Sequence, residues 1–363
     1  MSSPKSLSHG ENSFDALRLV LALVVVYSHS FAVGGFGNEW TLHYIKGQTT
    51  GGSAAVLGFF GISGYLVTKS FCNRPEWRVF IKRRLFRILP GFYFSLFVVS
   101  FILSPLIFFF KGDAGSSWRL KEAFDFIWQN ALVVIRKWSV GSAVEGLPYN
   151  EAINGSLWSL FPEISCYAAV LALGALGFLR KRPELLAVGG FLFLTHTLLI
   201  INPTIAVPIL PRLVIFGANM PFYISFLVGA AAYLWAGEKS FGKSGAIFWS
   251  LCGVFLLRYG GWSIFGPVVF PIALMHCAHS FSFRIPFDLS YGIYLYHFPC
   301  FQLAAALRLN QHGYLPFLIT GFILTLVLAV ISWFLIEKPV LALKAGRKPP
   351  VGTLAPGLAS GTS

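Results

Sequence analysis

Apolar runs close to the ~20 residues that cross a bilayer as an α-helix recur along the whole chain, and no other feature restricts its possible folds as strongly. The runs lie at residues 14–33, 53–71, 88–110, 155–179, 184–202, 217–236, 244–258, 262–280, 287–308 and 315–337. Only 12% of the residues are charged, which is about half the fraction in an ordinary soluble domain. The sequence therefore predicts an all-α, polytopic membrane helix bundle with about ten transmembrane helices.

The basic residues indicate how these helices are oriented. The formal net charge is +14, but the lysines and arginines are dispersed between the apolar runs, where such residues fix membrane topology. With both termini in the cytoplasm, nineteen of the 28 basic residues lie on the cytoplasmic side. We therefore expect both termini to be cytoplasmic, with the lipid bilayer as a partner and no nucleic-acid partner.

The rest of the chain indicates one membrane domain, at residues 1–343. The five cysteines are scattered singly, without the spacing of a metal site, so we expect packing roles for them and no metal. Residues 344–363 are rich in Pro, Gly and Ser and are predicted to form a disordered cytoplasmic tail. The longest stretch between apolar runs, 111–153, includes an amphipathic segment at 122–135, which we expect on the outer membrane surface, covering a substrate path.

Two strongly polar side chains interrupt the first apolar run. Arg18 and His29 are almost a whole number of helical turns apart, so they project from one face, roughly 16 Å from each other along the axis. A buried arginine in a membrane helix is costly unless it is paired or hydrated, and Asp15 lies one turn before it. In a purely structural interpretation, Arg18 extends to the membrane surface and His29 donates a helix–helix hydrogen bond. In the functional interpretation, both line one hydrated cavity.

Two later runs also carry ionisable groups. Glu163 follows Pro162 in NGSLWSLFPEISCY, and we expect it to face a wet cavity, with a structural ion pair as the alternative. His297 lies among tyrosines in SYGIYLYHFP, where packing or hydrogen bonding is the commoner role for a histidine.

A basic cluster, FIKRRLFRILPGFY, precedes and enters the third run. Arg84 and Arg87 are one helical turn apart and can present two guanidinium groups to phosphates. The alternative is the ordinary topology signal of basic residues beside a membrane helix.

Taken together, these motifs resemble the bacterial membrane acyltransferase-3 family over nearly the whole chain. The similar segments are D-x-x-R with ten residues between Arg18 and His29, then FFGISGYLV, FIKRRLFRILP, NGSLWSLFPEISCY, SYGIYLYHFP and SWFLIEKP. The resemblance implies a multi-pass enzyme of the bacterial cytoplasmic (inner) membrane. It further implies transfer of an acyl group from cytoplasmic acyl-CoA, most commonly acetyl-CoA, to a hydroxyl of a cell-surface or lipid-linked glycan.

On this basis we assign expected roles to twelve residues. The expected catalytic residues are His29, Arg18, Glu163 and Asp15; those for acyl-CoA are Arg84, Arg87, Arg83 and Ser63; and those for the acceptor are Asn154, Trp158, His297 and Tyr291.

The chemistry of acyl transfer agrees with a histidine at the centre of this set. Transfer from a thioester to a hydroxyl needs a base for the hydroxyl proton or a nucleophile that carries the acyl group, and neutral imidazole can do either. His29 is therefore predicted to act as general base or as transient acyl carrier. Two alternatives stay open: a transporter or flippase with a proton-coupled polar path, and an acyltransferase that modifies a small secondary metabolite.

Overall fold

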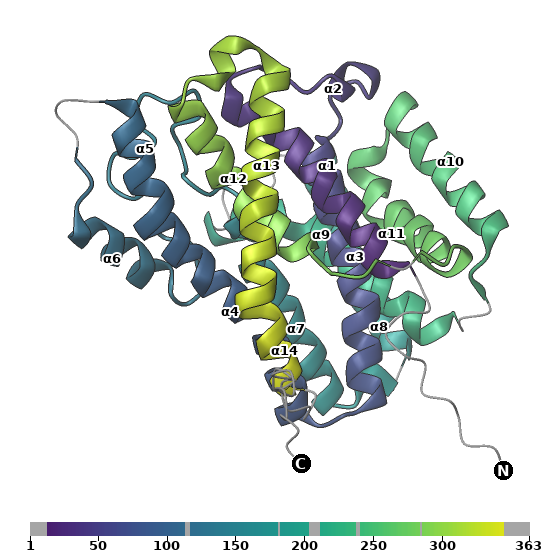
Figure 1. Cartoon of the computed structure of the whole chain (residues 1–363). Helices are drawn as coiled ribbons and strands as arrows, with labels where there is room; N and C mark the ends of the chain where they lie inside the picture. Colours follow the sequence, from purple (N-terminus) through teal and green to yellow (C-terminus); the bar gives the residue numbers. More distant parts are fainter. Residues whose placement is uncertain are drawn as a thin grey trace, which may run out of the picture.

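The computed structural model describes residues 13–112, 117–180, 182–202, 211–236, 240–283 and 285–344, and these residues form helices and no β-strand (Figure 1). The α-helices are α1 (Phe14–Gly34), α2 (Thr41–Tyr44), α3 (Gly51–Asn73), α4 (Trp77–Val98), α5 (Ser104–Lys111), α6 (Leu120–Asn130), α7 (Leu160–Ala175), α8 (Arg182–Ile201), α9 (Pro211–Trp235), α10 (Lys243–Tyr259), α11 (Trp262–Ser280), α12 (Ser290–Ala306), α13 (Tyr314–Ser332) and α14 (Lys338–Lys344). Short π-helical segments join α4 to α5 and α13 to α14.

Each of the ten predicted apolar runs coincides with a helix or a continuous helical segment. Among the described residues, seven helical segments have the length and apolar composition needed to cross a membrane, as α1 and α3 do. This confirms the all-α, polytopic membrane bundle. The number of ten transmembrane helices stays a prediction, because α10 and α12 have only 17 residues each and the side chains of the first turns of α9 lie outside the description. The predicted tail also lies outside the described residues, apart from Lys344.

Helix α4 begins earlier than the third apolar run, which predicts it. The run starts at residue 88, whereas α4 starts at Trp77 and includes the whole basic cluster. Lysine and arginine are good helix formers, and their aliphatic stems pack on apolar neighbours while the charges reach polar surroundings. The arginines of this cluster are therefore held on a regular helix that continues into the membrane.

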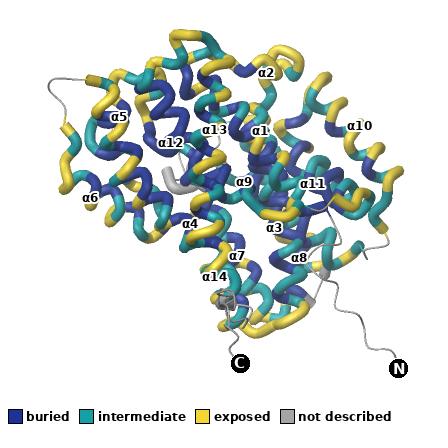
Figure 2. The backbone as a smooth tube through the Cα atoms, viewed as in Figure 1, coloured by how far each residue is buried: buried dark blue, intermediate teal, exposed yellow. Residues whose placement is uncertain are grey.

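The centre of the bundle is α12, which packs between α1 and α13. All its residues from Gly292 to Ala306 are buried (Figure 2). The helix has no separate polar, exposed face, as expected for a helix enclosed by other helices. Its polar side chains therefore face protein and not lipid.

Glycines bring α3 and α9 into close contact. A Cβ atom at Gly64 would collide with the backbone of Phe226, and one at Gly229 would collide with the backbone of Gly61. Membrane helices associate through such small residues because lipid provides no hydrophobic drive for packing. This contact fixes the position of α3, which carries part of the site described below.

The amphipathic segment predicted at 122–135 forms α6 and the turn that follows it. Ala123 and Phe126 are buried against the bundle, whereas Phe124 and Trp128 are 57% and 81% exposed. Exposed aromatic side chains of this kind favour a membrane interface. The predicted cover over a substrate path is not what α6 provides, because it packs on α4 and the π-helical segment after it, away from the pocket of the next section.

Candidate active site

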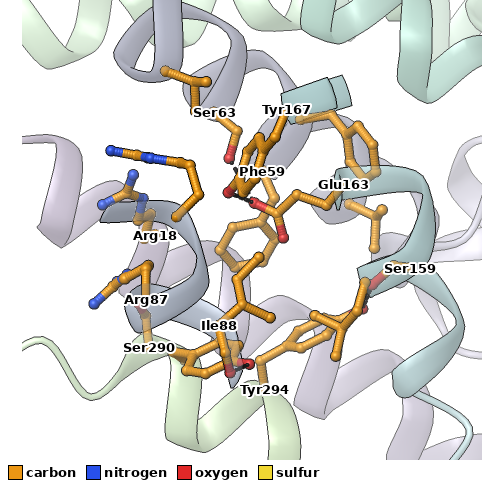
Figure 3. Close-up of a pocket in the computed structure, with 16 residues that line it drawn as sticks. Arg18, Phe59, Ser63, Arg87, Ile88, Ser159, Glu163, Tyr167, Ser290 and Tyr294 are labelled. Carbon is orange, nitrogen blue, oxygen red and sulfur yellow. Dashed lines mark hydrogen bonds between the residues drawn. The ribbon is translucent and has the colours of Figure 1, made fainter. Parts of the chain in front are cut away.

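A pocket with about 770 Å³ of space between atoms, its open mouth included, lies between α1, α3, α4, α7 and α12 (Figure 3). Several residues predicted from the sequence line it: Arg18, Ser63, Arg84, Arg87, Glu163 and Tyr291. They come from five different helices. We call this end of the bundle, where the three arginines lie, the basic end.

Two of the arginines already have carboxylate partners. Arg18 forms an ion pair with Asp15 at 3.2 Å, one turn away on α1. Arg87 donates a hydrogen bond to Oδ2 of Asp288, in the turn before α12. Oδ1 of Asp288 accepts hydrogen bonds from the backbone N–H and the hydroxyl of Ser290. Asp288 is therefore held by a guanidinium on one oxygen and by two Ser290 donors on the other.

Arg84 differs from them, because no carboxylate among the described residues forms an ion pair with it. Its Nε atom is buried without a hydrogen-bond partner, and one terminal nitrogen donates a long hydrogen bond of 3.4 Å to Ser70. Its charge lies 5.7 Å from the centre of the Tyr167 ring. Buried guanidinium groups are normally paired. A pocket lined by an unpaired guanidinium is suited to an anionic ligand such as a phosphate.

Glu163 faces the pocket from the first turn of α7. Its Oε1 atom accepts two hydrogen bonds, from the Ser63 hydroxyl at 3.0 Å and from the Tyr167 hydroxyl at 2.6 Å (Figure 3). Both donors are held by buried helices, so the carboxylate is fixed in one orientation. The sequence contains a signal for Tyr167 that our prediction missed, because it lies four residues after Glu163 and so on the same helix face.

We expect the Glu163→Gln substitution to preserve the fold and to lower the activity by at least about tenfold. The carbonyl oxygen of glutamine can still accept the hydrogen bonds of Ser63 and Tyr167, so the substitution removes chiefly the negative charge. The turnover rate and the melting temperature of the purified variant test this expectation. An unchanged rate would show that the charge has no part in the reaction.

His29 lies deeper along α1 and is paired with His297 of α12. Its Nδ1 atom lies 2.8 Å from Nε2 of His297, while Nδ1 of His297 lies 3.1 Å from the Ile293 carbonyl oxygen. A carbonyl only accepts, so His297 carries its proton on Nδ1 and its Nε2 accepts the proton of His29. The Nε2 atom of His29 then holds a free lone pair, and no described residue donates to it. The hydrogen bonds therefore leave Nε2 of His29 as an acceptor.

The expectation that Arg18 and His29 line one cavity needs correction, because His29 is absent from the pocket lining. Phe59 and Tyr294, whose ring centres are 5.7 Å apart, form part of the pocket wall. Ser156 contacts both the pocket wall and the histidine pair, through its backbone and its side chain respectively. Tyr294 donates to the Ser156 carbonyl at 3.1 Å, and the Ser156 hydroxyl lies 3.4 Å from Nε2 of His297.

The remaining predicted residues lie outside the pocket. The side-chain amide of Asn154 donates to the Leu295 carbonyl and its oxygen accepts from the Ser156 backbone, so it holds this segment against α12. Trp158 packs against Phe222 with ring centres 5.3 Å apart. Arg83 belongs to α4 but lies on a face that does not reach the pocket. None of the three lines the pocket.

These features define a class of protein: an integral membrane helix bundle with a pocket of basic side chains, one of which has no carboxylate partner among the described residues. A hydrogen-bonded imidazole lies beyond the pocket. This arrangement suits group transfer to or from an anionic carrier. The chain belongs to the acyltransferase-3 family, since the family model, described as an acyltransferase domain, matches residues 11–334. This protein is therefore a multi-pass membrane acyltransferase.

Two characterised relatives are similar over almost their whole lengths. An O-acetyl transferase of Shigella phage Sf6 is 25% identical over 347 residues, which cover 91% of this chain and 96% of the relative. Nodulation protein 10 of Rhizobium leguminosarum bv. viciae is 26% identical over 368 residues, which cover 92% and 94%. No solved structure matches the chain.

Proposed function

We propose that this protein transfers an acyl group, acetyl in the simplest case, from cytoplasmic acyl-CoA to a hydroxyl of a cell-surface or lipid-linked glycan. In this proposal the protein acts in the bacterial inner membrane, with the basic end toward the cytoplasm. The O-acetyl transferase among the relatives supports acetyl as the group. The observation that carries the proposal is an arginine-lined pocket in the same bundle as a histidine pair that leaves one imidazole nitrogen with a free lone pair.

The donor fits the basic end. Coenzyme A carries several phosphate charges, and the pocket offers Arg84 without a carboxylate partner, with Arg87 and Arg18 beside it. The thioester arm would then extend along α3 toward His29. Val56 of α3 lines the pocket, and Gly52, one turn earlier on the same helix, lies next to His29.

The histidine pair would perform the proton transfers. Nε2 of His29 accepts the proton of the acceptor hydroxyl while the oxygen forms its bond to the thioester carbonyl carbon. His297 holds His29 in the correct tautomer and stabilises the positive charge on the ring, as a carboxylate does in a hydrolase triad. When the carbon–sulfur bond breaks, His29 returns the proton to the departing thiolate, and the pair regains its initial state.

A direct assay tests the proposal against a transport function. The purified protein in lipid nanodiscs is incubated with radiolabelled acetyl-CoA, with and without lipid-linked glycan from the host cell, and free CoA and labelled glycan are measured. We expect both products only when the glycan is present. Release of neither product, with translocation of the glycan across a vesicle membrane, would favour a flippase.

The role of His297 gives a separate prediction. The His297→Phe substitution keeps a flat ring in the buried site but removes the acceptor for Nδ1 of His29. We expect kcat to fall by about 10²-fold or more, because His29 loses its tautomer control, while KM for acyl-CoA stays within about twofold since the pocket is untouched. If the variant only lowers the fraction of protein that folds, and kcat per folded molecule is normal, His297 has a packing role alone.

A further inference from the structure

A buried carboxylate lies at the opposite end of the bundle from the arginines. Glu39 belongs to the connection between α1 and α3 and is only 4% exposed. Its Oε1 atom accepts a hydrogen bond from the backbone N–H of Gly51, the first residue of α3. Its Oε2 atom is buried and has no hydrogen-bond partner. A buried carboxylate oxygen without a donor is costly and calls for an explanation.

Capping of α3 does not account for this second oxygen. Carboxylates near a helix N-terminus are stabilised by its unpaired N–H groups and its dipole, and Oε1 satisfies one of these groups. The Thr50 hydroxyl already accepts a hydrogen bond from the Ser53 backbone at 3.0 Å. Oε2 takes part in neither of these capping bonds. A hydroxyl donated by a ligand would satisfy it.

Aromatic side chains surround this carboxylate on its outer side. Trp40, next to it in sequence, is 63% exposed, and its ring centre lies 5.2 Å from that of Tyr314 and 5.4 Å from that of Phe31. An exposed tryptophan by itself is typical of a membrane interface. Exposed aromatic faces beside a buried hydrogen-bond acceptor are also what a sugar ring needs, since its C–H groups pack on the rings and its hydroxyls donate.

The carboxylate and the free nitrogen of His29 face neighbouring positions of α3. A Cβ atom at Gly51 would stand 3.2 Å from Oε2 of Glu39, and one at Gly52 would stand 3.6 Å from Nε2 of His29. Both residues are glycines, so α3 itself places no side chain here, and Val24 and Ser28 of α1 pack against the two positions. A ligand bound at Glu39 would therefore lie close to the base.

We infer that Glu39, Trp40 and Tyr314 form the acceptor subsite, in which Glu39 accepts a hydrogen bond from one hydroxyl of a sugar ring while a neighbouring hydroxyl meets Nε2 of His29. The inference rests on the proposed function and names the class of acceptor: a neutral sugar with adjacent hydroxyls. Nothing in the connection that holds Glu39 depends on the acyl-CoA pocket, so the subsite can be tested without the donor.

Saturation-transfer NMR on the full-length protein in nanodiscs tests sugar binding directly. The probes are methyl rhamnoside, methyl glucoside and chitobiose, each added separately. The Glu39→Gln variant keeps a carbonyl oxygen for the Gly51 N–H but places an amide donor where Oε2 accepted. The Trp40→Ala variant removes the exposed ring. Glu145→Gln is the matched control, because Glu145 is an exposed carboxylate in the loop whose Pro148 lies beside Gly35 at the end of α1.

We expect at least one sugar to give saturation transfer with the unaltered protein, and this signal to fall at least fivefold in Glu39→Gln and in Trp40→Ala but not in Glu145→Gln. CoA binding, measured by thermal shift, should be unchanged in all three variants. The inference is overturned if Glu39→Gln and Trp40→Ala keep the full signal, or if none of the sugars binds to protein that still binds CoA. Failure of the proposed function would appear differently, as sugar binding without acetyl transfer from labelled acetyl-CoA.

Discussion

Replacement of His29 by alanine is expected to lower the rate of acyl transfer by about 10²–10⁴-fold, the range typical of a lost general acid–base group. The hydrogen bonds of the histidine pair leave Nε2 of His29 as the free acceptor, and no other imidazole reaches that position among the described residues. The variant should retain its affinity for acyl-CoA, because the arginines of the pocket are untouched. Single-turnover rates with labelled acetyl-CoA and the purified variant measure the effect.

His196→Ala provides the control for this experiment. His196 is also a buried histidine in a membrane helix, and its Nε2 lies 2.9 Å from the Ser263 carbonyl oxygen, far from the pocket in the bundle. Its substitution removes an imidazole and creates a cavity without touching the proposed chemistry. Equal rates per folded molecule in the two variants would remove His29 from the mechanism.

The second large effect concerns stability. Removal of Arg87 by substitution with alanine leaves Asp288 as an unpaired, largely buried carboxylate, and breaking a buried pair in this way costs about 3 kcal/mol. The double variant Arg87→Ala, Asp288→Asn should regain much of that loss, because asparagine carries no charge and its carbonyl oxygen can still accept from Ser290. Chemical denaturation in detergent micelles measures the free energy of unfolding of both variants.

Affinity for acyl-CoA should separate from stability in the same set of variants. The double variant is expected to bind acyl-CoA weakly despite its recovered stability, since the guanidinium that we propose to face the phosphates is still missing. Arg84→Ala should lose affinity for acyl-CoA by about tenfold with little change in stability. No carboxylate among the described residues pairs with Arg84, so its removal leaves none unpaired. Arg83→Ala, one residue away but outside the pocket lining, is the matched control. An equal loss in Arg83→Ala would contradict the assignment of the phosphate site.

The positions of the helices could be predicted from the sequence because the thickness of the bilayer sets a length for every apolar run. The start of α4 could not be, since an apolar run marks only the part of a helix that suits lipid, and the charged first turns of α4 precede the run. The two glycine contacts between α3 and α9 were also beyond reach, because they depend on how closely two backbones approach and not on any pattern within one helix.

The sequence could indicate some of the residues that line the pocket, but not their pairings. The motifs identify Arg84, Arg87, Glu163 and both histidines individually. The partner of His29 is 268 residues away in the chain, and the partner of Arg87 is 201 residues away. Sequence spacing on one helix can place Arg18 and His29 on the same face, but only the packed bundle shows that Arg18 lines the pocket while His29 pairs with His297 of α12.

The enclosure of α12 has a consequence for how this protein is made. A segment of 17 residues that contains His297 and Gln302 gains little from lipid contact, so it has a weak tendency to leave the translocon by itself. The strongly apolar α13 follows directly and packs along it. Biogenesis is therefore expected to deliver α12 and α13 into the bilayer as a hairpin, with the catalytic centre assembled only when this last pair reaches helices inserted long before.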